Sequence, residues 1–402
     1  MSQKIIIIGS GFAGLWSALG AARVLDTNNK VAEVEITLIS PQPQLHLRPR
    51  LHEQAPHGMT VPLLAVLEAA RVKYLQGTVG QIHAGENCID VTDTKGNHQV
   101  LSYDRLVLTT GSKLFRPNVP GLDQHAHAVD QLDEAAKLDV HLARLADLPP
   151  TESRNTVVIV GGGFTGIEVA TEMPERLRKV FGEEAKFQVI MVDRGSEIGA
   201  ELGAGPRPVI TQALTEMGVK TVLSTSVTAI DANGVETSNG DRIYAKTVIW
   251  TGGMRASSLT EQVSSKRDGL GRIPVDRDLR VPGNSRIFAA GDVAFAATDD
   301  GGNYALMSCQ HAIDMGRYAG HNVAADLLGL PTLNYSQPFY VTCLDLGGWG
   351  AVYTEGWERE IKLVGAEAKA LKKRIVSEWI HPPLASRSAT LAAADPQRTV
   401  VE

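Results

Sequence analysis

Lys4 to Ala18 reads KIIIIGSGFAGLWSA, and Thr156 to Ala170 reads TVVIVGGGFTGIEVA. Each stretch is a short β-rich run followed by a GxGxxG loop and by small residues that suit the start of a helix. One such loop is weak evidence, but two copies in the same context are typical of dinucleotide-binding units. The two stretches predict an α/β protein with two Rossmann-like domains.

A second apolar strand follows each glycine loop and completes a βαβ unit of the expected length. The first of these strands ends at Ser40 and the second ends at Asp193. Further apolar runs at 105–109, 247–250 and 286–289 each lead into a glycine turn. Strands that end in such turns place backbone amides at the carboxyl edge of a parallel sheet, where ligands bind.

The composition and charge of the chain argue against several classes of protein. The chain has 402 residues and a formal net charge of -6, which argues against nucleic acid as a partner. Its three cysteines include no CxxC pair, and its histidines show no metal-ligand spacing. The glycine spacing at the N-terminus favours a phosphate-binding turn over a signal peptide, and no apolar run has the length of a membrane span. We therefore expect a cytoplasmic protein, with peripheral membrane contact left open.

The first loop is expected to bind a pyrophosphate through its amides and the positive end of the following helix. Its predicted contacts are the residues Gly9, Gly11, Phe12, Ala13 and Gly14. Ser40 occupies the position where an acid normally binds a ribose hydroxyl, so other groups must contribute, and Arg48 or Arg50 are candidates to reach the pyrophosphate.

The turn AAGDV places Gly291 and Asp292 directly after a strand. A carboxylate in this position can accept a hydrogen bond from a ribityl hydroxyl of a flavin cofactor, and a plain helix N-cap is the alternative role for Asp292. The helix that begins just after Met307 is expected to point its positive end at the flavin.

The second loop is expected to hold a nicotinamide cofactor through Gly161, Gly163, Phe164, Thr165 and Gly166. Asp193 suits a ribose 2′-hydroxyl and favours NADH, whereas the adjacent Arg194 suits the 2′-phosphate of NADPH. Glu168 is a candidate residue at the nicotinamide, and the alternative is an ordinary acid in the first turn of a helix.

Several other polar residues receive weaker interpretations. His311 is a candidate proton donor near the flavin, and Cys343 is interpreted as a buried structural thiol rather than a redox centre. His46, His52 and His57 follow Ser40 loosely, which indicates a loop rather than a site.

Together, the segments GSGFAG, LVLTTGS, VVIVGGGFTGIEVA, VIWTGG, IFAAGDVA and YVTCLDLG resemble the two-dinucleotide-binding flavoproteins of the pyridine nucleotide–disulfide reductase superfamily. Within it, the chain is most similar to type II NADH dehydrogenases and to apoptosis-inducing-factor-like quinone reductases. The resemblance implies FAD contacts from Gly9, Gly11, Gly14, Val79, Thr110, Gly111 and Asp292. It implies nicotinamide contacts from Gly161, Gly163, Gly166, Glu168, Asp193 and Gly252. The segment SCQHAIDMG keeps Gln310 of the family's quinone-site helix but lacks its second glutamine.

These observations predict four segments along the chain. Residues 1–125 and 263–331 are expected to form a discontinuous FAD domain, and residues 126–262 a nicotinamide domain inserted in it. Residues 332–402 are expected to form a small α+β domain with an antiparallel sheet, an amphipathic helix and a flexible tail from about Ala385.

The predicted C-terminal helix has an apolar face formed by Ala368, Leu371, Ile375 and Trp379. Its basic residues are Lys369, Lys372, Lys373 and Arg374. A helix of this kind can lie on a membrane, dock on its own chain or join a homodimer, and we favour docking.

The predicted function is an FAD-dependent NAD(P)H oxidoreductase that reduces a small acceptor, with quinone as the first candidate and Glu168, Gln310 and His311 as catalytic candidates. One alternative is a flavin-dependent oxidase or dehydrogenase of a specific metabolite. Another is a flavoprotein whose redox state controls binding to a protein partner.

Overall fold

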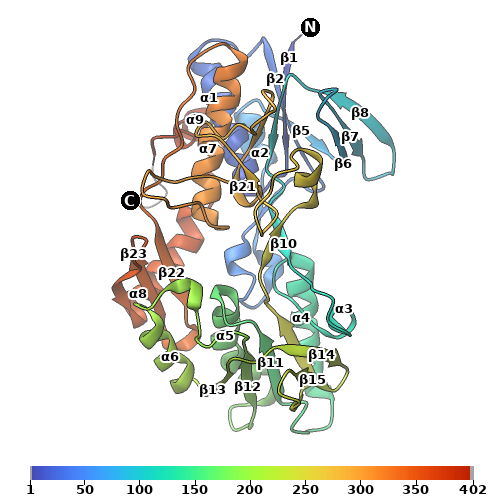
Figure 1. Ribbon diagram of the computed structural model, residues 1–402, viewed down its shortest axis with the longest axis vertical. Helices are drawn as coiled ribbons and strands as arrows, with labels where there is room; N and C mark the ends of the chain where they lie inside the picture. The colour runs from blue at the N-terminus through green and yellow to red at the C-terminus, as the bar shows by residue number, and fades with distance from the viewer. Residues whose placement is uncertain (1, 399–402) are drawn as a thin grey trace.

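The first glycine loop leads out of a five-stranded parallel sheet in a computed structural model that describes residues 2–398 (Figure 1). The strand order is β20-β9-β1-β2-β5. These strands span β1 Gln3–Ile8, β2 Val34–Ser40, β5 Lys73–Gln76, β9 Arg105–Leu108 and β20 Ile287–Ala289. β20 comes far later in the chain than β9. The chain therefore forms the second glycine loop before it adds the last strand of this sheet.

Two helices lie side by side over this sheet (Figure 1). They are α1 Phe12–Thr27, which follows the first glycine loop, and α7 Cys309–Leu327. A Cβ on Gly320 would lie 2.1 Å from the carbonyl oxygen of Ser17, so this close approach requires glycine. The α7 helix starts beside the end of β20, because Ala312 would contact a Cβ on Gly291 at 3.6 Å.

The second glycine loop belongs to a four-stranded parallel sheet with the order β13-β12-β11-β17. Its strands are β11 Thr156–Val160, β12 Gln188–Val192, β13 Val219–Val222 and β17 Thr247–Trp250. The accompanying helices are α4 Leu132–Arg144, α5 Phe164–Phe181 and α6 Arg207–Glu216. The predicted α/β class with two parallel sheets is confirmed, while the exact domain boundaries stay a prediction.

Smaller sheets and short helices accompany the two parallel sheets. One three-stranded antiparallel sheet consists of β6 Thr78–His83, β7 Cys88–Thr92 and β8 His98–Ser102. Another consists of β14 Val227–Asp231, β15 Gly234–Thr237 and β16 Arg242–Tyr244. Three strand pairs are β3 Gln44–His46 with β4 Thr60–Pro62, β10 Ser112–Leu114 with β18 Met254–Ala256, and β19 Ile273–Pro274 with β21 Ala294–Phe295. Two short helices are α2 Leu64–Ala69 and α3 Leu122–His125.

The C-terminal segment forms an antiparallel sheet with α8 packed on it. The strands are β22 Val341–Asp345, β23 Ala351–Glu355 and β24 Glu360–Val364, and α8 Gly365–Arg374 continues into a π-helical turn, Ile375–Trp379. Ala368 is fully buried against this sheet, with Leu371 and Ile375 packed beside it, so the helix packs on its own chain. Contact of this helix with a membrane or a second subunit stays a prediction. Lys372, one of the basic residues of the predicted helix, is buried with a carboxylate partner.

The tail that was expected to be flexible contains a helix instead. Residues Arg387–Ala393 form α9, which packs near α1. Arg387 pairs with Asp26, and Asp395 lies 2.7 Å from Arg23. These ion pairs give the polar tail partners that its composition alone does not reveal. Residues 399–402 of the expected tail lie outside the described residues.

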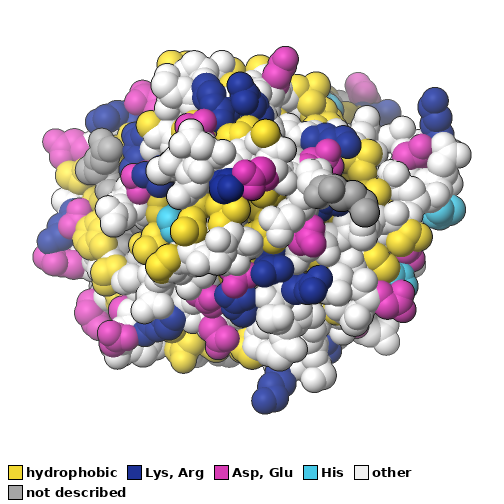
Figure 2. All heavy atoms as spheres, turned by 90° about the horizontal axis from the view of Figure 1, so that it is seen from above, with side chains coloured by type: hydrophobic (Ala, Val, Ile, Leu, Met, Phe, Trp, Pro, Cys, Tyr) yellow, Lys and Arg dark blue, Asp and Glu magenta, His cyan; other side chains and the backbone are white. Residues whose placement is uncertain are grey.

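On the face seen in Figure 2, side chains of both charge signs are interspersed with hydrophobic ones, so neither sign dominates that face. Within residues 2–398, no helix has the combined length and apolar character that crossing a membrane requires.

Candidate functional site

The first glycine loop leaves its backbone open at the carboxyl edge of the five-stranded sheet. No side chain within the described residues caps the start of α1, where Phe12 and Ala13 are buried. A Cβ on Gly14 would lie 1.8 Å from the carbonyl oxygen of Gly9, whereas a Cβ on Gly11 would meet nothing within 4 Å. Free amides at a helix start with open space in front of them suit a phosphate group.

The turn after β9 and the turn after β20 face the same edge of the sheet. Thr110 Oγ1 is buried and has no partner among the described residues. Gly111 adopts a φ of 66° and a Cβ there would be free of contacts, whereas Gly291 lies against Ala13. A buried hydroxyl without a partner indicates a missing polar group, which a bound ligand would supply.

Asp292 lies beside these turns in a buried polar network. Its carboxylate accepts a hydrogen bond from Ser112 Oγ at 2.5 Å and lies 3.5 Å from Arg48 Nη1. Burial raises the pKa of Asp292, against the opposing effects of Arg48 and Ser112. Asp292 does not act as a helix N-cap. It lies inside the short 3-10 turn Gly291–Val293, and the N-cap of α7 is Ser308.

Three other residues considered as FAD contacts have partners inside the protein. Arg48 pairs with Asp130 at 2.5 Å as well as with Asp292, so these acids, rather than an open pyrophosphate site, hold its guanidinium. Arg50 pairs with Glu53. Ser40 is buried and its hydroxyl donates to the carbonyl oxygen of Gln42 at 2.7 Å. The hydroxyl of Ser40 also lies 3.3 Å from Tyr74 Oη, so both of its contacts are inside the protein.

Val79, the predicted adenine contact, is buried in β6 and pairs with Val91 of β7.

The second glycine loop is held by two carboxylates. Asp193 accepts the amides of Gly162 and Gly195, each at 2.6 Å. Glu201 Oε1 accepts the amide of Phe164, the first residue of α5, at 2.8 Å. This carboxylate occupies the helix start where a pyrophosphate is expected. Sequence reasoning missed Glu201, because nothing in its loop marks it as a neighbour of the glycine loop.

The other predicted residues of this loop are where the motif places them. A Cβ on Gly166 would lie 1.9 Å from the carbonyl oxygen of Gly161, and one on Gly163 would lie 2.8 Å from Glu201. Thr165 is in the first turn of α5, and Gly252 follows β17 against the ring of Trp250.

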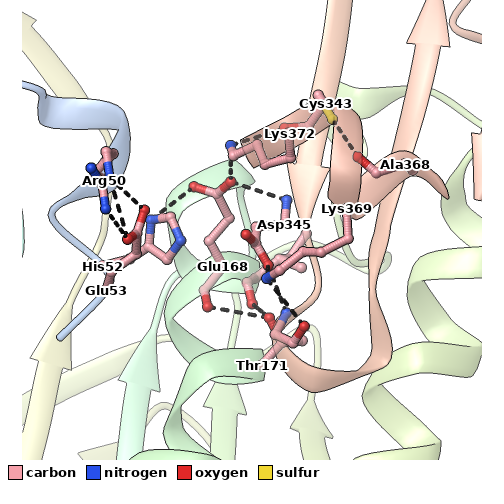
Figure 3. Close-up of polar contacts among 12 residues, drawn as sticks. Arg50, His52, Glu53, Glu168, Thr171, Cys343, Asp345, Ala368, Lys369 and Lys372 are labelled. Atoms are coloured by element: carbon pink, nitrogen blue, oxygen red, sulfur yellow. Dashed lines mark hydrogen bonds and ion pairs between the residues drawn. The ribbon is translucent and has the colours of Figure 1, made fainter. Parts of the chain in front are cut away.

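Glu168 is the centre of a buried polar cluster that joins three distant segments (Figure 3). Its Oε1 accepts hydrogen bonds from Lys372 Nζ at 2.8 Å and from the amide of Asp345 at 3.1 Å. Its Oε2 lies 3.4 Å from His52 Nδ1. Burial opposes the charge of Lys372, but Glu168 more than compensates, so the pKa of Lys372 is raised. Glu168 is therefore no ordinary first-turn acid.

Sequence reasoning missed both side-chain partners of Glu168, His52 and Lys372. The sequence predicts an unspecific loop around His52, yet this residue is 4% exposed and contacts α5. The sequence places Lys372 among the basic residues of an amphipathic helix and gives it no partner. The one signal for its burial is its register: Lys372 follows Ala368 by four residues, which places it on the same face of a helix as that buried alanine.

The first turn of α7 faces the C-terminal sheet. Gln310 Oε1 accepts the amide of Val341 at 3.4 Å. His311 Nδ1 lies 2.9 Å from Ser308 Oγ, and its ring stacks on Tyr340 with centroids 4.6 Å apart. Burial, reinforced by Arg359 and Arg272, lowers the pKa of His311 to about 3. A neutral imidazole at physiological pH argues against the predicted role of His311 as a proton donor.

Cys343 is a buried thiol in β22, and burial raises its pKa to about 12. Because the thiolate is the reactive form, this environment supports the structural interpretation.

Comparisons with known proteins agree with this architecture. The family model for pyridine nucleotide-disulphide oxidoreductases matches residues 3–316. An NADH dehydrogenase-like protein of Mycobacterium tuberculosis is 46% identical over 98% of both chains. A type II NADH:quinone oxidoreductase of Staphylococcus haemolyticus is 25% identical over 93% of this chain and 94% of its own. The NDH2 structure from Plasmodium falciparum, solved with NADH, has a TM-score of 0.78 and 17% identity over 98% of both chains.

The chain belongs to the pyridine nucleotide-disulphide oxidoreductase family. Within this family it is an NADH dehydrogenase-like oxidoreductase.

Proposed function

We propose that the protein binds FAD at the first glycine loop and NADH at the second, and passes electrons from NADH to a small acceptor, with a quinone as the first candidate. The observation that carries this proposal is the pair of glycine loops, each at the carboxyl edge of its own parallel sheet. The names of relatives that act on NADH and quinones support the choice of donor and acceptor.

The residues at the first loop fit FAD. The open amides at Gly11 suit its pyrophosphate, and the unpartnered Thr110 hydroxyl and the buried carboxylate of Asp292 suit hydroxyl groups of the cofactor. When bound, FAD supplies the two-electron chemistry that protein side chains lack. The part of the protein is to orient both cofactors and to hold charges and protons near them.

Asp193 supports NADH over NADPH as the donor. One of its oxygens accepts the amide of Gly162 in the second loop and the other accepts the amide of Gly195 in its own turn, which fixes a negative charge at the position expected for the ribose. That charge would repel a 2′-phosphate. Arg194 is exposed and adjacent, so NADPH is the comparison to make in the assay.

The test is anaerobic stopped-flow reduction of the FAD-loaded protein with NADH and with NADPH, followed by mixing with menadione. We expect rapid bleaching of the flavin by NADH, slower bleaching by NADPH, and reoxidation by the quinone. Bleaching without reoxidation by menadione would contradict the quinone proposal and favour a metabolite acceptor. No bleaching by either nucleotide would contradict the donor.

A further inference from the structure

Asp292, in the turn after β20, uses only one of its two carboxylate oxygens for hydrogen bonds within the described residues. Its Oδ2 accepts the hydroxyl of Ser112 at 2.5 Å and lies 3.5 Å from Arg48 Nη1. Its Oδ1 accepts no hydrogen bond from residues 2–398 and is not one of their fully buried unpartnered atoms. Because an ionised carboxylate accepts several hydrogen bonds, Oδ1 is left for a hydroxyl group of a ligand.

Arg48 is shared between two acids and lies closer to the one outside the turn after β20. The distance from its Nη2 to Asp130 Oδ1 is 2.5 Å, against 3.5 Å between its Nη1 and Asp292 Oδ2. The side chain of Asp130 is 8% exposed, so water screens its attraction for the guanidinium poorly. Asp130 therefore keeps Arg48 from closing on Asp292.

Asp130 also fixes the strand that carries Ser112. Its Oδ2 accepts the amide of Leu114, the last residue of β10, at 3.1 Å. Ser112 is the first residue of the same strand. Asp130 thus acts on both groups that hold Asp292 Oδ2, because it contacts Arg48 directly and Ser112 through β10.

The charges of this cluster do not balance. Asp130 and Asp292 are two acids, and they share the single charge of Arg48. Arg272 also acts on Asp292, but its guanidinium is paired with Asp268 at 2.7 Å. Without the charge of Asp130, Arg48 is free to pair with Asp292 alone. Pairs between a guanidinium and a carboxylate are frequently bidentate, so this pairing would occupy both carboxylate oxygens.

We propose that Asp130 is a positioning residue for FAD, which holds Arg48 away from Asp292 so that Asp292 Oδ1 stays free for a ribityl hydroxyl. This inference rests on the proposed binding of FAD at the first glycine loop. Asp130 lies just before α4, which begins at Leu132 and accompanies the second parallel sheet, whereas Asp292 lies at the first sheet. The retention of FAD therefore depends on a residue from the nicotinamide side of the molecule.

The test measures the release of FAD from the loaded protein. Each variant is loaded with FAD and diluted, and the flavin that separates from the protein on filtration is followed over time. We expect Asp130→Asn to release FAD at least about 10-fold faster than wild type, because the cofactor loses a hydrogen bond to a charged group. Asp133→Asn is the matched control, since it makes the same change three residues along the chain at a side chain that is 72% exposed.

Removing Arg48 as well as the charge of Asp130 gives the decisive variant. If the freed Arg48 occupies Asp292, then Arg48→Met combined with Asp130→Asn frees Oδ1 again, and FAD release should lie within about 3-fold of wild type. If Asp130 only stabilises the fold, the second substitution adds to the loss and release is faster than that. The double variant decides between these roles even if Asp130→Asn alone does not fold.

The outcomes separate this inference from the proposed function. If the wild type takes up no FAD, both fail. If the wild type holds FAD and Asp130→Asn releases it at the same rate, the inference alone is overturned, as it is by rapid release from the double variant. If FAD is held as expected but NADH does not bleach it, the proposed donor fails and the role of Asp130 stands.

Discussion

Replacing Lys372 by methionine should destabilise the protein far more than the same change at Lys369. Both lysines are on α8, and each pairs with a carboxylate from another element. They differ in burial, since the side chain of Lys372 is 7% exposed and that of Lys369 is 26% exposed. The comparison therefore isolates the effect of burial on an ion pair.

The expected magnitudes follow from that difference. Removing Lys372 leaves the buried Glu168 without its cation and Cys343 without a donor to its carbonyl oxygen. Breaking one side of a buried pair costs about 3–5 kcal/mol. The Lys369→Met change removes a more exposed partner of Asp345, for which we expect about 1 kcal/mol.

The assay is urea-induced unfolding of the FAD-loaded variants followed by circular dichroism. Adding Glu168→Gln to Lys372→Met should recover part of the loss, because the double variant no longer buries an unpaired charge. Equal destabilisation by Lys372→Met and Lys369→Met would refute the reasoning. So would a double variant whose loss equals the sum of the two single losses.

Three further predictions concern the two loops and α5. Glu201→Gln should tighten NADH binding about 2- to 5-fold, because it removes the negative charge that opposes a pyrophosphate at the start of α5; calorimetric titration that shows equal or weaker binding would contradict this. Gly14→Ala should abolish FAD retention, because its Cβ would collide with the Gly9 carbonyl; flavin absorbance that stays with the protein on gel filtration would count against it. Burial raises the pKa of Glu172 from 4.5 to about 7. The unfolded chain therefore ionises this carboxyl first, so stability falls as pH rises from about 4.5 to about 7, and Glu172→Gln should flatten that part of a melting-temperature profile.

Local sequence was sufficient to predict the two glycine loops. A β-rich run, fixed glycine spacing and a helix start are neighbours in the chain, so their geometry depends on a few adjacent residues. For the same reason Asp292 could be placed in the turn directly after a strand, whereas its burial and its contact with Ser112 come from the structure. The partners of these residues were less predictable: Arg48 is held by Asp130, and Glu201 lies on the start of α5.

Sequence by itself determined that this protein has two Rossmann-like cores, because a β-rich run, a GxGxxG loop and a helix start recur twice with the same local spacing. Only the tertiary structure decided what surrounds Glu168. His52 comes from the loop after β3 and Lys372 from α8, so neither has a fixed spacing from Glu168 in the chain. Their meeting depends on how three segments pack, and a buried carboxylate is stable there only because that packing supplies an ammonium and an imidazole.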